Sequence, residues 1–158
     1  MAIEIERRFL VRKDIRRFCQ DGVRIVQGYL PSRRNTIRVR LAGSEGTLTI
    51  KSRRRGLCRD EIEFSISGEY ATHLLRVACR EGLIEKTRYI VPHGGLSWEI
   101  DVFEGENAGL VIAEVELSHP EQLVPLPDWV GAEVTHVSAY SNSSLSRAPI
   151  RRWSAAAA

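Results

Sequence analysis

The stretch that decides the fold is residues 1–10, MAIEIERRFL, in which charged and apolar residues alternate. Successive side chains of a β-strand point to opposite faces, so Glu4, Glu6 and Arg8 share one face while Ile5 and Phe9 lie on the other. A single strand of this kind is also typical of a solvated sheet edge, because the exposed faces of antiparallel sheets are polar. The weight of the pattern therefore depends on how often the chain repeats it.

The same alternation returns in six further segments. They are TIRVRL with Arg38 and Arg40, LTIKSR with Lys51 and Arg53, RDEIEF with Arg59, Glu61 and Glu63, EKTRY with Lys86 and Arg88, WEID with Glu99 and Asp101, and AEVEL with Glu114 and Glu116. Most of these charged sets carry one sign and interleave with Ile, Val, Leu or Phe, as strands do. Together with VRIVQGYL at 23–30, they predict eight antiparallel strands.

Helices are expected between and after the strands. The clearest is predicted over 69–81, where apolar residues fall at helical spacing between two glycines. A short helix or turn is expected between Asp14 and Gly22, and short helices near 121–124 and 140–145. The segment EGENAG at 104–109 has no strand-loop-helix context, so it predicts a hairpin turn and not a phosphate loop.

Composition limits the class of protein. With 158 residues, 43% of them hydrophobic, the chain suits one globular domain over 1–150, followed by a frayed tail at 151–158. A net charge of +3 fits an anionic ligand without requiring nucleic acid. Three cysteines without metal-ligand spacing indicate reduced thiols, and no segment reads as a membrane span or signal peptide. The sequence therefore predicts a cytoplasmic protein that binds neither membrane nor nucleic acid, and a homodimer is compatible with it.

The charged strand faces are expected to point inward. If they pointed outward, the apolar faces of eight strands would enclose a dry barrel, and the helix at 69–81 would have no apolar surface to cover. If they point inward, helices can pack on the outside, and eight strands enclose room for one small ligand. On patterning alone, a sheet with a solvated polar face stays an open alternative.

The paired positions suggest what such a ligand is. They hold eight acids (Glu4, Glu6, Glu61, Glu63, Glu99, Asp101, Glu114 and Glu116) and eight bases (Arg8, Arg38, Arg40, Lys51, Arg53, Arg59, Lys86 and Arg88). Clustered carboxylates repel one another unless a cation lies between them, and hard divalent ions such as Mg²⁺ or Mn²⁺ take oxygen ligands. Clustered arginines and lysines favour a polyanion. A divalent metal with a polyphosphate satisfies both sets.

Taken in order, EIERRFLV, QGYL, TIRVRL, LTIKS, RDEIEF, IEKTRY, WEIDVFEG and NAGLVIAEVEL resemble the CYTH superfamily of triphosphate tunnel metalloenzymes, in particular its short bacterial members. The resemblance covers residues 3–146. It implies an α+β fold: a closed eight-stranded antiparallel β-barrel with a few helices packed outside. It also implies that the barrel holds a linear triphosphate, with Mg²⁺ or Mn²⁺ carried by carboxylates.

Carried over position by position, the resemblance and the inward pattern assign roles. The triphosphate-binding residues are expected to be Tyr29, Arg38, Arg40, Lys51, Arg53, Arg59, Lys86 and Arg88. The metal is expected on Glu4, Glu6, Glu61, Glu63, Glu99, Asp101, Glu114 and Glu116. Catalysis is expected to use Glu114 or Glu116 to activate water, with Lys86 and Arg8 beside the reacting phosphoryl group.

The chain departs from the family pattern in two places. The signature Glu-x-Glu-x-Lys has Arg8 where the lysine belongs, and arginine is bulkier, forked and always charged. Before Tyr140, Val137 and Ala139 stand where family members usually carry an acidic and a basic residue. These departures bear on the reacting phosphoryl group and on a contact at the cavity mouth.

The expected activity is metal-dependent hydrolysis of the terminal phosphoanhydride of inorganic tripolyphosphate or another triphosphate. One alternative is a class IV-type adenylyl cyclase on the same scaffold, which would release cyclic AMP from ATP. Another is a non-catalytic polyphosphate- or nucleotide-binding protein, which would bind tightly without turnover. The sequence leaves these alternatives open.

Overall fold

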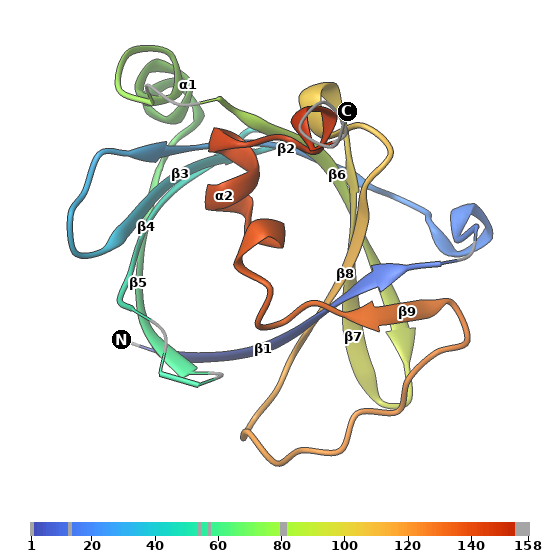
Figure 1. The fold of residues 1–158 in the computed structure, drawn as a ribbon. Helices are drawn as coiled ribbons and strands as arrows, with labels where there is room; N and C mark the ends of the chain where they lie inside the picture. Colours follow the sequence, from blue (N-terminus) through green and yellow to red (C-terminus); the bar gives the residue numbers. More distant parts are fainter. Residues whose placement is uncertain (1, 13, 54, 57, 80–81, 154–158) are drawn as a thin grey trace.

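The computed structural model describes residues 2–12, 14–53, 55–56, 58–79 and 82–153. Its strands are β1 (Ala2–Val11), β2 (Val23–Leu30), β3 (Thr36–Ala42), β4 (Glu45–Lys51), β5 (Cys58–Ser67), β6 (Ile84–His93), β7 (Leu96–Phe103), β8 (Val111–Glu116) and β9 (Val130–Glu133). They pair in the order β5-β4-β3-β2-β6-β7-β8-β1-β9, and β1 also pairs with β5, which closes a ring of eight antiparallel strands (Figure 1). The predicted closed barrel is confirmed.

Strand β1 closes the ring, and β9 extends it. Glu4 lies opposite Arg59 of β5, whereas Arg8 lies opposite Glu114 of β8. Strand β9 joins β1 beyond the β5 pairing, with Phe9 opposite Glu133. A strand has two edges and β8 occupies one of them, so β5 and β9 share the other. The sequence analysis did not predict β9.

Helix α1 (Gly68–Val77) covers the outer face of the barrel over β3 and β4 (Figure 1). Ala71 and Leu75 are buried there against Val39 of β3. Because the charged faces of the strands point inward, their apolar faces lie on the outside of the barrel, where α1 packs against them. The predicted helix over 69–81 is too long at its C-terminal end, because the observed helix ends at Val77, and residues 80 and 81 lie outside the described residues.

A second outer face, formed by β1, β7 and β8, is covered by the segment that leads to β9. Trp98 of β7 packs between Phe9, at a ring-centroid distance of 5.6 Å, and Trp129, at 5.4 Å. The helix predicted at 121–124 is absent from this described segment. Pro125 and Pro127 explain this, because proline disfavours helical conformation in the residue before it and lacks an N–H donor.

The remaining helices are short. The 3₁₀ turns are Arg16–Phe18, Gly105–Asn107, Ser138–Tyr140 and Ile150–Arg152, and the second α-helix is α2 (Asn142–Arg147). The first and second turns correspond to the predicted short helix or turn and to the hairpin loop. The helix expected near 140–145 corresponds to α2. Within the described residues, no helix is long and apolar enough to cross a membrane.

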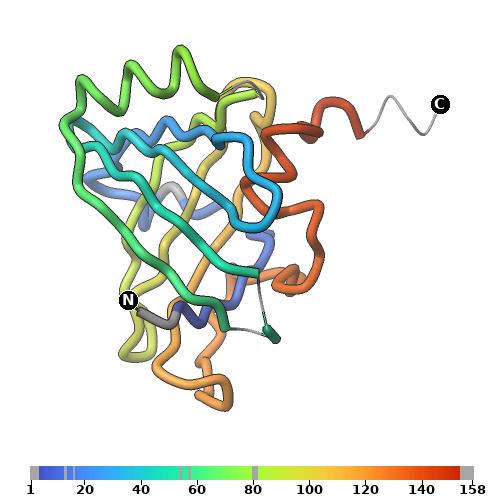
Figure 2. The backbone as a smooth tube through the Cα atoms, turned by 90° about the vertical axis from the view of Figure 1, so that its left-hand side faces the viewer, coloured from blue at the N-terminus to red at the C-terminus, as the bar shows by residue number. Residues whose placement is uncertain are grey.

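The C-terminal segment lies across one end of the barrel, as Figures 1 and 2 both show. Leu145 of α2 packs with Ile84, Phe103 and Ile112 in one buried apolar cluster. The ring of Trp153 contacts that of Tyr140 at 5.1 Å, so this part of the tail predicted at 151–158 is packed, and residues 154–158 lie outside the described ones. This end of the barrel is therefore filled by apolar side chains and α2.

Candidate active site

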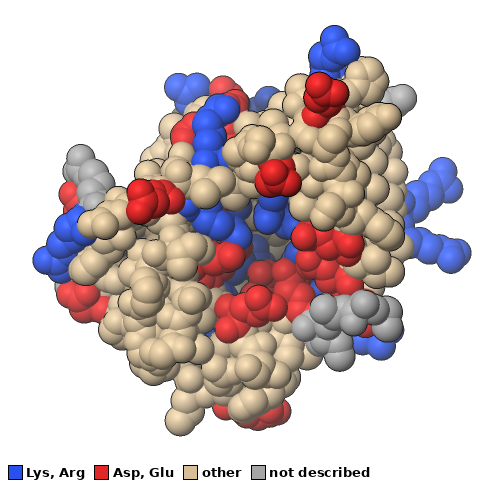
Figure 3. Space-filling model, turned by 180° about the vertical axis from the view of Figure 1, so that it is seen from behind, with Lys and Arg blue, Asp and Glu red and all other residues tan. Residues whose placement is uncertain are grey.

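A polar cavity of about 570 Å³ occupies the inside of the barrel. Figure 3 shows it as a hollow lined by acidic and basic side chains, seen from the end opposite α2. The charged positions predicted from the sequence that line it are Glu4, Glu6, Arg8, Arg38, Arg40, Lys51, Arg59, Glu61, Glu63, Arg88, Glu99, Glu114 and Glu116, together with Tyr29. Most of the predicted site is thus brought together in one place.

Three predicted residues do not line the cavity. Arg53 is exposed and lies beyond the end of β4 at Lys51, because the strand stops before the alternation in the sequence does. Lys86 and Asp101 point into the barrel but are fully buried behind the cavity wall. Asp101 contacts the cavity lining through Arg88, and Lys86 contacts it through Asn142.

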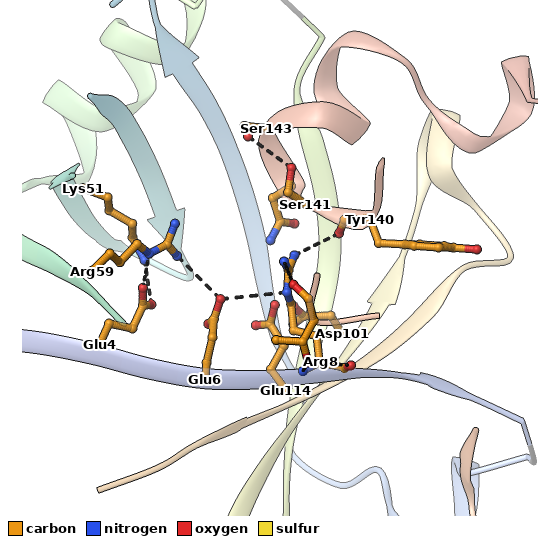
Figure 4. Close-up of polar contacts among 12 residues, drawn as sticks. Glu4, Glu6, Arg8, Lys51, Arg59, Asp101, Glu114, Tyr140, Ser141 and Ser143 are labelled. Atoms are coloured by element: carbon orange, nitrogen blue, oxygen red, sulfur yellow. Dashed lines mark hydrogen bonds and ion pairs between the residues drawn. The ribbon is translucent and has the colours of Figure 1, made fainter. Parts of the chain in front are cut away.

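On the β1 and β5 side, the bases neutralise carboxylates. Glu4 accepts hydrogen bonds from Lys51, at 2.7 Å, and from Arg59 (Figure 4). Lys51 also lies 2.6 Å from Glu61. Burial alone would raise the pKa of Glu4, but the hydrogen bond from Arg59 and the charge of Lys51 lower it to about 2. Glu4 is therefore ionised at neutral pH, and its two basic partners are paired.

On the β6 and β7 side, the pairing is denser. Arg88 makes two hydrogen bonds of 2.7 Å to Asp101 and one of 2.9 Å to Glu114, and it also contacts Glu99. Burial alone would raise the pKa of Asp101, but the charges of Lys86 and Arg88 hold it at about 2. Burial lowers the pKa of Lys86 to about 8 although Asp101 opposes this shift. At pH 7 the group is thus an ionised network shared by two bases.

The bases of β3 are different, because their close partners are mainly neutral. Arg40 donates to Gln27 at 3.2 Å, and Gln27 donates to the Tyr29 hydroxyl at 2.8 Å. Arg38 donates to Thr49 at 3.0 Å. Among the described residues, Arg38 forms an ion pair with Glu63, at 3.6 Å, and the Glu63 side chain is 47% exposed.

The charge of Arg40 is not compensated by an ion pair within the described part of the chain. Burial, and then the charges of Arg38 and Arg88, lower its pKa to about 10. A buried guanidinium of this kind is costly unless an anion neutralises it. Burial also raises the pKa of Tyr29 to about 12, so its phenol is a neutral hydrogen-bond donor or acceptor. The β3 side of the cavity is therefore suited to an anionic ligand.

The acids near the open end of the cavity are suited to a cation. Burial, and then the charges of Glu4, Glu99 and Glu61, raise the pKa of Glu116. Its carboxylate makes no hydrogen bond or ion pair to the residues that the structure describes. Among those same residues, no three His, Cys, Asp or Glu side chains are grouped closely enough to hold a metal by themselves. Negative charge is gathered here without a preassembled metal site.

The two departures from the family pattern have different surroundings. Val137 and Ala139 are exposed and do not line the cavity. Arg8 lines it, but its guanidinium donates to the backbone carbonyls of Thr135, at 3.1 Å, and Tyr140, at 3.3 Å (Figure 4). The departure at Val137 and Ala139 therefore lies away from the site, whereas the departure at Arg8 is part of it.

The sequence analysis missed several lining residues. Gln27 does not line the cavity itself, but it accepts a hydrogen bond from the lining residue Arg40 and shares the inward face with Tyr29, so the two-residue spacing could have identified it. Ser141, Asn142 and Ser143 line the cavity from the start of α2. Nothing in their local sequence indicates this, because only the packing of the C-terminal segment across the barrel brings them there.

The fold and cavity define this chain as a member of the CYTH domain family, whose family model matches residues 2–148. An inorganic triphosphatase of Acetivibrio thermocellus is 39% identical over 154 residues, covering 97% of this chain and 99% of that one. An inorganic triphosphatase of Nitrosomonas europaea is 37% identical over 153 residues, covering 90% and 95%. The assignment to the CYTH family, expected from the sequence, is confirmed.

Solved structures agree with this assignment. The crystal structure of an inorganic triphosphatase superposes with a TM-score of 0.64 at 33% identity, covering 92% of this chain and 95% of that one. A putative adenylyl cyclase from Hippeastrum, whose description notes a dominant triphosphatase activity, superposes with a TM-score of 0.56 over 77% of this chain and 81% of that one. At 17% identity the second likeness supports the fold alone.

Proposed function

We propose that this protein is a triphosphatase that hydrolyses the terminal phosphoanhydride of inorganic tripolyphosphate. The observation that carries the proposal is the pair Arg38 and Arg40, two largely buried guanidiniums that face the polar cavity and, among the described residues, have no carboxylate partner closer than 3.6 Å. A linear polyphosphate supplies oxygens that arginine binds in a forked geometry. The inorganic triphosphatases to which the chain is similar support the same activity.

The cavity suits a chain of phosphates better than a single one. Arg38 and Arg40 lie on β3, Lys51 lies on β4, Arg59 lies on β5 and Arg88 lies on β6. A longer polyanion can contact bases from more strands at once, so each added phosphate gains charge-assisted hydrogen bonds. Bases such as Lys51 would exchange part of their contact with Glu4 for contact with phosphate oxygens. We infer that tripolyphosphate binds better than pyrophosphate.

A divalent metal, Mg²⁺ or Mn²⁺, is part of the proposal. The donor set fits, because the acids facing the cavity offer oxygen only, and burial together with the negative charges of its neighbours raises the pKa of Glu116. Magnesium is commonly held by one or two carboxylates together with substrate phosphates. We propose that the carboxylates of Glu116, Glu99 and Glu61 would hold this ion, with Glu4 and Glu6 nearby. When bound, the ion neutralises phosphate charge and increases the acidity of a bound water.

The residues of the chain supply the remaining chemistry. Glu116 has the features of a group that orients and deprotonates water, because its carboxylate faces the cavity and makes no hydrogen bond or ion pair to the residues that the structure describes. Arg38 and Arg40 would hold the chain and stabilise negative charge on the phosphoryl oxygens in the transition state. Glu114 is engaged by Arg88, so we assign it to fixing that guanidinium. The closure of β1 against β5, β8 and β9 supports treating residues 1–150 as one catalytic domain.

The test is phosphate release from tripolyphosphate, pyrophosphate, ATP and thiamine triphosphate, each with Mg²⁺ and with Mn²⁺. We expect tripolyphosphate to be hydrolysed fastest and the Glu116→Gln variant to lose activity by about 100-fold or more, within the range for removing a general base. Glu121→Gln is the matched control, because Glu121 is a largely exposed carboxylate. Three results would contradict the proposal: hydrolysis of pyrophosphate as fast as that of tripolyphosphate, formation of cyclic AMP from ATP, or normal activity of Glu116→Gln.

A further inference from the structure

Arg8 contacts the C-terminal segment at three points. Its backbone N–H donates to the Thr135 hydroxyl at 3.0 Å, and its two terminal nitrogens donate to the carbonyls of Thr135, at 3.1 Å, and Tyr140, at 3.3 Å. The residue is 6% exposed, and its Nε lies 3.9 Å from Glu6. The side chain thus spans two carbonyls that are five residues apart in the chain.

The segment that Arg8 holds forms one wall of the cavity. Directly after Tyr140, Ser141, Asn142 and Ser143 line the cavity at its α2 end. The wall is also held from behind, because Asn142 accepts a hydrogen bond from the buried Lys86 at 3.3 Å, and Leu145 is fully buried. The position of this wall therefore depends on Arg8 at the start of the segment and on apolar packing at its end.

We propose that Arg8 is a positioning residue that holds the segment 135–140 and thereby fixes the end wall of the cavity, formed by residues 141–143, and that this wall sets the length of polyphosphate that fits. Arginine suits this role because its fork presents several N–H groups in fixed directions, so it can bond two carbonyls at once. A lysine ammonium at this position is a compact charge on a flexible stem and cannot span both carbonyls with the same rigidity.

The length argument rests on the proposed function, because it assumes that a linear polyphosphate occupies the cavity. A chain that enters from the open end seen in Figure 3 meets the wall near Ser141 and α2 (Figure 1). While the wall is fixed, only a short chain can place its terminal phosphoryl group beside Glu116. If the wall loosens, a longer chain can enter further. Selectivity for three phosphates over four is therefore assigned to the contacts of Arg8.

The test compares Arg8→Lys with Arg12→Lys, a matched control. Arg12 also lies near the end of β1 and donates to a backbone carbonyl, that of Asp128 at 3.2 Å, but it does not line the cavity. The first readout is amide hydrogen exchange of residues 136–147 without ligand. We expect it to increase about tenfold in Arg8→Lys, the effect of losing one charge-assisted hydrogen bond, and to stay unchanged in Arg12→Lys.

The second readout is the ratio of the affinities for tripolyphosphate and tetrapolyphosphate, measured by calorimetry in a Glu116→Gln background. We expect the ratio to fall in Arg8→Lys. Trp153→Ala gives an independent route to the same result, because this ring supports Tyr140 from outside the cavity. The same shift in both variants would show that the wall, and not the charge at position 8, controls the selectivity.

The outcomes separate this inference from the proposed function. Faster exchange in Arg8→Lys supports the positioning role even if the protein shows no triphosphatase activity, because that readout involves no substrate. Unchanged exchange together with a fall in kcat for tripolyphosphate would mean that Arg8 acts on the phosphate directly, which overturns the inference. An unchanged affinity ratio in both Arg8→Lys and Trp153→Ala would overturn the assignment of length selectivity.

Discussion

Strands β3 and β6 carry the same sequence pattern, two bases separated by one residue, and both direct them into the barrel. Arg38 and Arg40 of β3 meet neutral partners such as Gln27 and Thr49. The bases of β6 instead contact carboxylates of β7 and β8. Asp101, for example, accepts hydrogen bonds from both Lys86 and Arg88. The role of a basic pair is thus decided by its neighbours in the sheet. The β3 pair is left for a ligand, whereas the β6 pair is held in ion pairs with neighbouring carboxylates.

The largest expected effect tests the β6 side. Asp101→Asn removes the carboxylate that neutralises Lys86 and Arg88 while keeping the side-chain volume. Because Lys86 is fully buried, we expect the free energy of unfolding to fall by about 3 to 5 kcal/mol, as when one partner of a buried ion pair is removed. Urea unfolding measures this, with Arg40→Gln as the control that should change stability little. Equal losses in both variants would break the comparison between the two strands.

The next effect is on stability in acid. The folded-state pKa values of Glu4 and Asp101, both about 2, lie below their ordinary values of 4.5 and 3.8. The stability that these carboxylates contribute is therefore fully present above about pH 4.5 and is lost as the pH falls toward 2. For Glu4 this amounts to at most about 3 kcal/mol. Between pH 7 and pH 2.5, the free energy of unfolding should fall less steeply in Glu4→Gln than in the wild-type protein. Parallel curves for the two proteins would contradict the lowered pKa of Glu4.

A smaller effect is expected on ligand binding at β3. Arg40→Gln removes an unpaired charge, so the affinity for tripolyphosphate should fall by about 10- to 100-fold, the worth of a charge-assisted hydrogen bond. Calorimetry in a Glu116→Gln background avoids hydrolysis during the measurement. Arg34→Ala, on the exposed turn between β2 and β3, is the control and should bind normally. If it weakened binding as much as Arg40→Gln, the ligand site would not lie inside the barrel.

The smallest effect is expected on the outer face of β1. Arg7 pairs with Glu133 of β9 at 2.7 Å, but the two side chains are 26% and 38% exposed. Surface pairs of this kind contribute about 0 to 1 kcal/mol, so Arg7→Ala should lower the free energy of unfolding by less than about 1 kcal/mol. A loss as large as that of Asp101→Asn in urea unfolding would show that exposure does not separate the two kinds of pair.

The barrel could be predicted from the sequence because its signal is local and repeated. The segment at 23–30 was predicted end to end, and the predicted segments TIRVRL and WEID lie within β3 and β7, where alternation placed the charges on one face of each strand. Strand β9 was not predictable in this way, because VGAE is short and its pairing depends on the edge of β1 that β5 leaves open. That dependence is tertiary and leaves no mark in the local pattern.

The site was predictable as a set of residues but not as a set of contacts. Alternation identifies Arg40 and Lys86 equally well, yet only the pairing of the strands decides their partners. Arg40 lies opposite Gln27, whereas Lys86 contacts Asp101, two residues before its opposite residue Phe103. Arg53 continues the alternation past the last residue of β4, so the pattern placed it one step too far. The guanidinium of Arg8 donates hydrogen bonds to backbone carbonyls far along the chain, and the carbonyl of Thr135 is 127 residues away. No local pattern predicts such a contact.

The closure of the ring by β1 has a consequence for biosynthesis. Glu4 finds Arg59 at a separation of 55 residues, but Arg7 finds Glu133 only at a separation of 126. Strand β1 is therefore synthesised well before β8 and β9, which complete the pairing of its edges, and contacts of such high sequence separation form slowly. Unpaired edges invite association with other chains, and charged residues on a strand discourage it. The carboxylates and arginines of β1 would thus protect the nascent chain before they ever line a cavity.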